Sequence, residues 1–528
     1  MNKLTRREML KFIGLGSAGM ALAACVPPQA AATAPAAGGE AVSMEPVSIT
    51  LIESWFGVPQ FTESIEPITQ ALSKKMMDEG LNIELHSLIL ADHNAKYPAL
   101  YASGSDFTMA FDAPWNKMNS LRDQGALLPI EGLIEEHGPM LKEAITEKIY
   151  KANFTNDHLY GIPTAYYYGG TGGAIYREDL RQQWGADAPT SAGGWASLES
   201  FLAAVVKNAP EMIPFVNVAT QSVTSYAGAR RALNPGVNKT GVIIPDPMVD
   251  WQLIDEEEYA PMVEGAELLR SWWEQGYINK TDVPFSGQSQ NSQVDYVYPG
   301  RATACVENEP EYKQIDQTKQ MKSTNPDAVL AGVDLTGMRA GNFKGRGSLK
   351  QWNFIVFNVN APAAQQQAGI EYYNWLTGSQ DNMDLWLMGI DGVNYKKEDN
   401  LKFSEIAGTD AARNYRRQWY VSGVSGRYQR QPVDLPKDAE DALAFFTTES
   451  NWDFNPYESF EADTKVLELD AAKLNGVYDE ATHGFNSGQE ATADAIAKMK
   501  QMLDGAGRQE YKAKLQKQVD DYIAAHKA

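Results

Sequence analysis

The sequence predicts an α/β protein whose first elements are a strand, a helix and a second strand of a parallel sheet. Residues 47–52 are rich in β-branched side chains and alternate apolar with polar positions, which is typical of a strand. Residues 63–79 carry apolar side chains at helical spacing, and residues 82–90 indicate another strand. A strand–helix–strand start of this kind builds a parallel sheet.

A third strand is predicted at residues 107–111, and polar and aromatic side chains follow it directly. The strand runs into Asp112, and Trp115 comes shortly after. Trp55 follows the first strand in the same way. Because ligands of open α/β sheets bind outside the carboxyl ends of the strands, we expect these three side chains to lie at a ligand-binding edge.

Later segments predict helices and two glycine-rich connections. The apolar spacing predicts helices over residues 121–128, 198–207, 265–277 and 510–525. Residues 160–173 and 337–347 are rich in glycine and polar or tyrosine residues, so we expect the chain to cross between two lobes there. Four tryptophans fall inside helical patterns and are expected to be core residues: Trp272, Trp273, Trp375 and Trp386.

The composition limits which classes of protein this chain can belong to. The chain has 528 residues, of which 43% are hydrophobic, and this is long enough for two domains. Twelve tryptophans and twenty-four tyrosines exceed what a core requires, which favours a ligand surface. The net charge of -22 argues against nucleic acid as a partner, because phosphates demand a basic face.

The first 25 residues have the pattern of an export signal. Arg6 and Arg7 precede a weakly apolar run, residues 12–24, which is shorter than the roughly 20 residues of a spanning helix. Paired arginines before such a run indicate a twin-arginine signal. Residues 22–25, Leu-Ala-Ala-Cys, resemble the lipobox of bacterial lipoproteins, in which the cysteine, here Cys25, is lipidated and becomes the mature N-terminus.

Other interpretations of this segment are weaker. Residues 14–19 match the dinucleotide-binding fingerprint, but no strand precedes them. A cleaved signal without lipid and a permanent single-pass anchor are the alternatives, whereas the Ala-, Pro- and Gly-rich residues 26–45 have the composition of a flexible linker behind a lipid tether. With Cys25 lipidated, only Cys305 is left, so no intramolecular disulfide is expected.

The order of several short motifs resembles a known family. A strand ending in Asp-x-x-Trp is followed by Gly-Ala-Leu-Leu, by Tyr-Gly-Ile-Pro and by Ile-Tyr-Arg-Glu-Asp-Leu, at residues 112–115, 125–128, 160–163 and 175–180. Further similar segments lie at residues 189–195, 300–305, 361–376 and 389–395. Together these motifs resemble the family 1 extracellular solute-binding proteins, the lipoprotein receptors of carbohydrate ABC importers.

The resemblance implies an α/β fold of the periplasmic-binding-protein-like type II, with two discontinuous lobes and a ligand cleft between them. It implies the following division: signal peptide 1–25, linker 26–45, N-terminal lobe 46–164 and 336–400, and C-terminal lobe 165–335 with a final helical part 401–528. The implied function is an extracytoplasmic receptor, anchored to the outer face of the membrane by N-terminal acyl groups. This receptor captures an oligosaccharide for the permease subunits of an ABC transporter, acts as a monomer and needs no cofactor.

Sugar binding has its own chemical requirement. The C–H face of a pyranose packs on an aromatic ring, and its hydroxyls need planar polar groups. Loop positions supply this mixture and are the candidate ligand-binding residues: Trp55, Asp112, Trp115, Tyr166, Tyr167, Glu309, Trp352 and Trp452. We expect Trp115 and Trp352 to form part of a stacking surface whose faces hinge closure brings together around a sugar.

Signals for catalysis and for metal binding are weak. Sixty-eight acidic residues leave a surface glycoside hydrolase or lyase as the alternative, because paired carboxylates cleave glycosides. The six histidines show no zinc spacing, and the sequence has neither a Gly-x-Ser-x-Gly motif nor a Walker loop. Asp453, Asn455 and Glu458 lack the spacing of a calcium loop. We therefore expect neither catalytic nor metal-binding residues. Besides a receptor and an enzyme, the third class of protein to consider is an adhesin or cell-wall structural protein.

Basic residues gather in two places in this acidic chain. Four of them precede Trp352, and five arginines between residues 413 and 430 interleave with aromatic residues. The first group is Arg339, Lys344, Arg346 and Lys350. Both groups fit a solvated face or, as an alternative, a surface for an acidic uronate oligosaccharide, because arginine pairs with carboxylates in a bidentate manner.

Overall fold

The structure is a computed structural model. It describes residues 45–53, 62–90, 93–104, 106–155, 157–164, 167–218, 222–224, 236–245, 251–278, 293–406, 428–455 and 457–526. Residues 1–45 and 46–528 form separate units, and every described helix and strand lies in the second unit.

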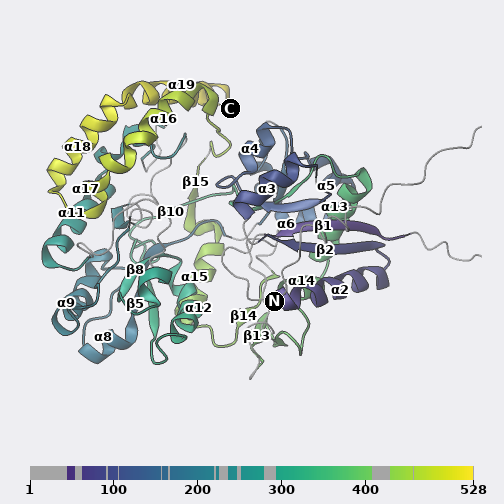
Figure 1. The fold of residues 1–528 in the computed structure, drawn as a ribbon, viewed down its shortest axis with the longest axis horizontal. Coiled ribbons are helices and arrows are strands. Elements are labelled where there is room, and N and C mark those ends of the chain that lie inside the picture. The colour runs from purple at the N-terminus through teal and green to yellow at the C-terminus, as the bar shows by residue number, and fades with distance from the viewer. Residues whose placement is uncertain are drawn as a thin grey trace, which may run out of the picture. The chain divides into compact units, whose positions relative to one another are not determined.

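The first sheet has five strands in the order β2-β1-β3-β11-β4 (Figure 1). They are β1 (Val47–Glu53), β2 (Ile83–Ile89), β3 (Met109–Asp112), β4 (Gly161–Pro163) and β11 (Phe354–Phe357). β1 is parallel to β2 and β3, as the sequence predicted, whereas β11 is antiparallel to both β3 and β4. A strand from late in the chain therefore occupies an inner position in a sheet begun by the first strands.

Helices cover both faces of the first sheet (Figure 1). They are α2 (Thr62–Asp78), α3 (His93–Ala102), α4 (Met118–Asp123), α5 (Glu131–His137), α6 (Pro139–Ile145), α7 (Glu147–Ala152), α13 (Ala363–Thr377) and α14 (Gln380–Leu387). Successive strand residues point to opposite faces, so Leu51 packs in the core of α2, α13 and α14 while Ile52 packs in the core of α3 and α4. β3, β4 and β11 are buried at every residue, which explains why they are apolar except for Asp112.

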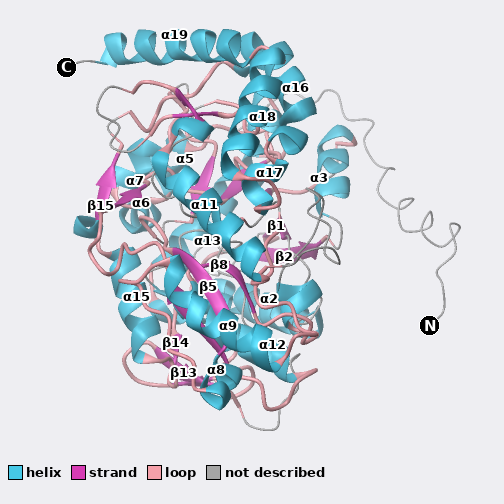
Figure 2. Cartoon of the chain, turned by 90° about the vertical axis from the view of Figure 1, so that its left-hand side faces the viewer, coloured by secondary structure: helices cyan, strands magenta, loops and turns pink. Residues whose placement is uncertain are grey.

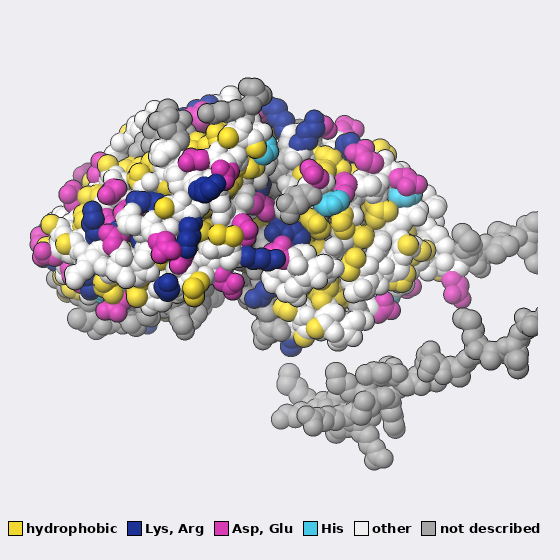
Figure 3. Space-filling view, turned by 90° about the horizontal axis from the view of Figure 1, so that it is seen from above, with side chains coloured by type: hydrophobic (Ala, Val, Ile, Leu, Met, Phe, Trp, Pro, Cys, Tyr) yellow, Lys and Arg dark blue, Asp and Glu magenta, His cyan; other side chains and the backbone are white. Residues whose placement is uncertain are grey.

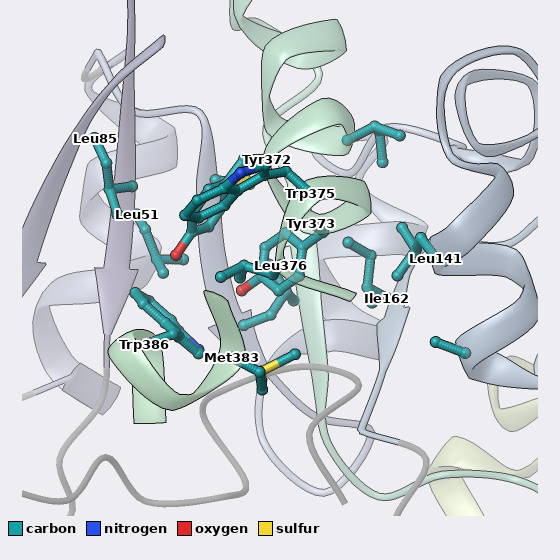
Figure 4. Close-up of a cluster of buried hydrophobic side chains, with 14 of the residues drawn as sticks. Leu51, Leu85, Leu141, Ile162, Tyr372, Tyr373, Trp375, Leu376, Met383 and Trp386 are labelled. Atoms are coloured by element: carbon teal, nitrogen blue, oxygen red, sulfur yellow. The ribbon is translucent and has the colours of Figure 1, made fainter. Parts of the chain in front are cut away.

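Aromatic side chains from α13 and α14 fill the larger of these cores. Tyr372 and Trp386 meet edge to face with ring centroids 5.7 Å apart, close to Leu51 (Figure 4). Trp272, Trp375 and Trp386 are buried, as their helical positions predicted, and Trp273 is half-buried. Phe403 and Tyr428 also pack in this core, beyond the residue 400 at which we expected the lobe to end.

The second sheet has three strands in the order β8-β5-β9, and both outer strands are antiparallel to β5. The strands are β5 (Gly172–Arg177), β8 (Ala304–Asn308) and β9 (Leu330–Asp334). The helices near them are α8 (Glu178–Trp184), α9 (Glu199–Asn208) and α12 (Pro310–Lys322). The free Cys305 is buried in β8.

The C-terminal helices pack together with α11 (Figure 2). These helices are α11 (Ala260–Gln275), α16 (Thr464–Ala481), α17 (His483–Ser487), α18 (Thr492–Gly505) and α19 (Arg508–His526). Tyr511, Leu515 and Val519 of α19 are buried and Tyr522 is half-buried, in agreement with the apolar spacing that predicted a helix over residues 510–525. None of the described helices combines the length and the hydropathy that crossing a membrane requires.

An arginine with no exposed surface joins α19 to the segment before α11. Arg508 donates to both carboxylate oxygens of Glu257, at 2.7 Å each. It also lies 3.1 Å from Asp255 and 3.0 Å from Asp504. Burying a guanidinium is tolerated only when it is paired in this way, so the three carboxylates fix where α19 packs.

The remaining elements are short. They are β6 (Val242–Ile243), β7 (Ile254–Asp255), β10 (Gly345–Gly347), β12 (Lys396–Lys397), β13 (Lys402–Ser404), β14 (Gln431–Pro432), β15 (Trp452–Phe454) and α15 (Lys437–Thr447), with the segments η1 (Trp195–Leu198), η2 (Glu256–Glu258), η3 (Gln293–Val297) and η6 (Glu449–Asn451). Acidic and basic side chains are interspersed over the face that Figure 3 shows.

Two chain segments connect the first sheet to the second. Residues 164–171 run from β4 to β5, and residues 335–353 run from β9 to β11. The two connecting segments are hydrogen-bonded to each other, because Thr164 N donates to Asn353 O (3.1 Å) and Ser348 N donates to Tyr168 O (2.6 Å). Both lie at the glycine-rich stretches that the sequence indicated as crossings.

One predicted helix was wrong in its second half. We expected a helix over residues 121–128, but α4 ends at Asp123. Gly125 has a φ of 71°, a left-handed conformation that ends the helix. Leu128 N then donates to Phe357 O at 2.9 Å, so the chain runs beside β11 instead.

Candidate functional site

Trp115 and Trp352 lie at the same edge of the first sheet. β11 is antiparallel to β3, and Phe354 is paired with Asp112. Trp352 therefore precedes β11 where Trp115 follows β3, at the carboxyl end of the parallel strands. We expected hinge closure to bring these two tryptophans together, but strand pairing already places both on one edge. The sequence analysis assigned residues 336–400 to the N-terminal lobe but predicted no strand at residues 354–357, so this shared edge could not be expected.

These two tryptophans are the exposed ones among those that the structure describes. Trp115 is 55% exposed and Trp352 is 64% exposed, although large aromatic side chains are normally buried. Each of these exposed indoles, at the carboxyl edge of a sheet, offers a face on which a flat apolar ring can stack. We call Trp115, Trp352 and the adjoining Asn353 the ring-binding surface.

The backbone that carries Trp352 is held from two sides. The Glu458 carboxylate accepts hydrogen bonds from the backbone amides of Leu349 (2.9 Å) and Lys350 (3.0 Å). On the other side, Asn153 accepts from the amide of Gln351 at 2.8 Å and donates to the carbonyl of Leu349 at 2.9 Å. Hydrogen bonds thus fix the backbone next to the exposed ring. Glu458, which we considered as a metal ligand, is one of the residues that fix it.

The buried side chain of Asp112 holds the turn that carries Trp115. Its carboxylate has no exposed surface and accepts hydrogen bonds from the backbone amides of Ala113 (2.8 Å) and Lys117 (3.1 Å). These bonds close the turn that carries Trp115. Burial raises the pKa of Asp112 to about 6, although the amide donors act in the opposite direction. We expected Asp112 to contact the ligand, and in the structure its carboxylate contacts the turn.

The raised pKa of Asp112 predicts a pH-dependent effect of Asp112→Asn. Between about pH 4 and pH 6 the folded state keeps a proton that the unfolded state has released, so Asp112 contributes less to stability as the pH rises through this range. Asparagine keeps the acceptor oxygen and does not titrate. Relative to the unmodified protein, the variant should therefore gain roughly 2–3 kcal/mol of unfolding free energy between pH 4 and pH 7. Urea unfolding at several pH values measures this difference, and a pH-independent difference would contradict it.

Three other candidate residues gather around the first connecting segment. The ring of Tyr167 meets Phe446 edge to face, with centroids 5.5 Å apart. Trp452 is buried, and a Cβ atom on Gly169 would lie 2.4 Å from its ring. A Cβ on Gly170 would lie 2.2 Å from Glu309 Oε1, so these glycines allow the segment to pass close to both side chains. Trp452 thus packs inside the protein, in contrast to the exposed position that a ligand contact requires.

Trp55, Tyr166 and the lipidation candidate Cys25 lie outside the described residues, as do the arginines of the group at 413–427.

Three of the four basic residues that precede Trp352 are paired with carboxylates. Arg339 lies 2.6 Å from Glu311, Lys344 lies 2.8 Å from Asp453 and Lys350 lies 3.2 Å from Glu461. Arg430 is buried against Asp384 at 2.8 Å. Within the described ranges, no group of three or more histidine, cysteine or acidic side chains is arranged to hold a metal ion.

A cavity of about 540 Å³ lies elsewhere, between β9, the loop at 189–191 and α15. Glu311 and Glu178 line it, but the first is bonded to Arg339 at 2.6 Å and the second to Arg181 at 2.7 Å. None of the candidate binding residues lines this cavity. Its lining contains one aromatic side chain, Tyr176, so the ring-binding surface is the better candidate site.

Sequence reasoning missed the side chains that hold the ring-binding surface in place. Asn353 Oδ1 accepts from the indole nitrogen of Trp115 at 3.0 Å, across the paired strands. Asn153 and Glu458 come from segments distant in sequence. The sequence shows Asn353 as a polar neighbour of Trp352. Its hydrogen bond to Trp115 depends on the register between β3 and β11, which cannot be predicted from the sequence.

The comparisons with known proteins concern the fold. Residues 456–524 match the model of a domain of unknown function, DUF3502. No curated protein matches the chain. The structure of the N-glycan transport solute binding protein NgtS from Streptococcus pneumoniae aligns with a TM-score of 0.70 at 16% identity, over 90% of this chain and 99% of that chain.

Two further solved structures align over similar lengths. An HMO-binding, ABC-transporter-associated solute binding protein from Bifidobacterium longum infantis has a TM-score of 0.60 at 15% identity, over 92% of this chain and 100% of that chain. The alginate-binding protein AlgQ2 has a TM-score of 0.59 at 15% identity, over 90% and 98%. The fold predicted from the sequence motifs is confirmed: the chain has the periplasmic-binding-protein-like fold of ABC-transporter solute-binding proteins.

Proposed function

We propose that this protein is an extracytoplasmic receptor that captures an oligosaccharide and delivers it to the permease subunits of an ABC transporter. The observation that carries the proposal is the ring-binding surface, where Trp115 and Trp352 are 55% and 64% exposed on a hydrogen-bonded base. An exposed indole costs free energy in water and gains it when a sugar face covers it. The structural neighbours described as binding or transporting sugars support the same function.

The ligand in this proposal is a neutral oligosaccharide. Arg339, Lys344 and Lys350 already pair with carboxylates, so an acidic sugar would have to displace an ion pair to reach them. A pyranose without charge needs only stacking and hydrogen bonds. The alginate-binding neighbour makes an acidic oligosaccharide the appropriate comparison in a binding test.

The remaining parts of the proposal concern the chain around the site. The residues of the first sheet and those of the second form the two lobes, which close on the ligand by bending the segments 164–171 and 335–353. The twin-arginine signal directs export, and a diacylglyceryl group on Cys25 anchors the monomeric receptor to the membrane. Binding occurs without turnover.

A thermal-shift screen tests the function. We expect a neutral oligosaccharide to raise the melting temperature of the protein, because a ligand that binds only the folded state stabilises it by mass action. A uronate oligosaccharide should produce no shift. The appearance of new reducing ends or unsaturated products during incubation would instead identify a carbohydrate-active enzyme, and the absence of any shift across a broad panel would favour an adhesin.

Trp352→Ala is the matching variant. It should weaken binding of the stabilising oligosaccharide about tenfold, which corresponds to about 1.4 kcal/mol. The melting temperature without ligand should be nearly unchanged, because the ring is 64% exposed. Leu469→Ala is the control, since Leu469 is 70% exposed on α16 and does not belong to the ring-binding surface. Equal affinities of both variants would contradict a role of Trp352 in binding.

A further inference from the structure

Asn353 lies where the ring-binding surface meets the first residue of β11. Asn353 follows Trp352 and directly precedes β11, and the residue is 7% exposed. Its Oδ1 accepts a hydrogen bond from Trp115 Nε1 at 3.0 Å. This bond ties the ring of Trp115 to the residue that follows Trp352.

The backbone of Asn353 is fixed as well. Its carbonyl accepts hydrogen bonds from Thr164 N (3.1 Å) and Thr164 Oγ1 (2.8 Å). Thr164 is 2% exposed and begins the first connecting segment. The opposite end of the Asn353–Trp115 contact is equally constrained, because the buried Asp112 carboxylate closes the turn that carries Trp115. Hydrogen bonds therefore hold the backbone of Asn353 and the turn that carries Trp115.

The chemistry of the two groups determines how the amide of Asn353 is oriented. An indole nitrogen can only donate a hydrogen bond, so the amide oxygen must face Trp115. The NH₂ group is then turned away from Trp115, and it has no hydrogen-bond partner among the described residues. The amide of Asn353 consequently holds a hydrogen-bond donor beside the indole of Trp115.

We propose that Asn353 both positions the ring of Trp115 and determines which polar group the ligand must offer. Its NH₂ group donates to an oxygen of the ligand, a hydroxyl or a ring oxygen, whose sugar ring stacks on the neighbouring indole. The ligand class is a neutral pyranose oligosaccharide with such an oxygen at the edge of the stacked ring. This inference rests on the proposed function, because it assigns a role within the same surface.

Two variants separate the positioning role from the donor role. Asn353→Asp keeps an oxygen that accepts from Trp115 but removes the donor. Asn353→Ala removes both groups. The first readout needs no ligand. It follows the indole N–H signals in NMR spectra of ¹⁵N-labelled full-length protein, and the Trp115 signal is identified by its loss in Trp115→Phe. We expect hydrogen exchange of this indole to accelerate at least about threefold in Asn353→Ala and to stay unchanged in Asn353→Asp.

The second readout is the affinity for the neutral oligosaccharide that stabilises the unmodified protein. Asn353→Ala should bind about tenfold more weakly, and Asn353→Asp at least about threefold more weakly, because both lack the donor. Unmodified affinity of Asn353→Asp would overturn the donor role, and unaltered indole exchange in Asn353→Ala would overturn the positioning role. If no oligosaccharide stabilises the unmodified protein, the proposed function itself fails, whereas the exchange measurement still decides whether Asn353 holds Trp115.

Discussion

Replacing Trp452 by alanine is expected to lower the free energy of unfolding by about 3–5 kcal/mol, the range for truncating a large aromatic side chain in a core. Trp452 is 2% exposed and lies against both connecting segments. A Cβ atom on Gly169, Gly345 or Gly347 would come within 2.4, 2.8 or 2.6 Å of its side chain. The indole therefore packs directly against the backbone of three glycines from two segments. Alanine at position 452 would leave a cavity that these glycines cannot fill.

Urea unfolding followed by circular dichroism measures this loss, with Trp352→Ala as the control. The control removes the same side chain from a position that is 64% exposed, so its unfolding free energy should change by no more than about 0.5 kcal/mol. Comparable losses in the two variants would mean that Trp452 is not a core residue. Both tryptophans were candidate ligand-binding residues in the sequence, and the variants should separate them.

Replacing Arg508 by methionine is expected to destabilise the protein by about 3–5 kcal/mol, because removing one partner leaves buried charges uncompensated. Glu257, with 2% of its side chain exposed, would lose the guanidinium that pairs with it, whereas Asp255 would keep Lys512 at 2.6 Å. Methionine is a matched replacement because it is of similar length, is unbranched and favours a helix.

Lys517→Met is the control for Arg508→Met. Lys517 also lies on α19 and pairs with Asp521, but both side chains are more than half exposed, at 74% and 65%. An exposed ion pair of this kind contributes at most about 1 kcal/mol. The urea midpoint should therefore fall clearly only in Arg508→Met. An unchanged midpoint in that variant would show that apolar packing alone holds α19.

The sequence predicted those parts of the fold that depend on local periodicity. β1, α2 and β2 appear within one or two residues of their predicted bounds, because one buried face imposes a repeat that neighbouring residues carry. The buried face of α19 was predicted for the same reason. The place of β11 between β3 and β4 was not predictable, since it depends on pairing between residues far apart in the chain.

The candidate site shows the same limit at the level of single side chains. Trp115, Trp352 and Trp452 all have polar neighbours in the sequence, which suggested exposure for each of them. Trp452 is buried because glycines of two distant segments pack against it, and no pattern near residue 452 signals this. Asp112 was correctly placed at the carboxyl end of β3, but which of its neighbours the carboxylate contacts depends on the geometry of the turn.

The inner position of β11 has a consequence for how the chain reaches its native state. β4 pairs with β11 and not with β3, so a ribosome-bound or truncated chain that stops before Phe354 leaves a gap in the middle of its first sheet. The facing edges of β3 and β4 would then offer unpaired backbone groups to any other strand, including those of a second nascent chain. The contact order of this sheet is high, and the folding of the first core has to wait until most of the protein has been synthesised.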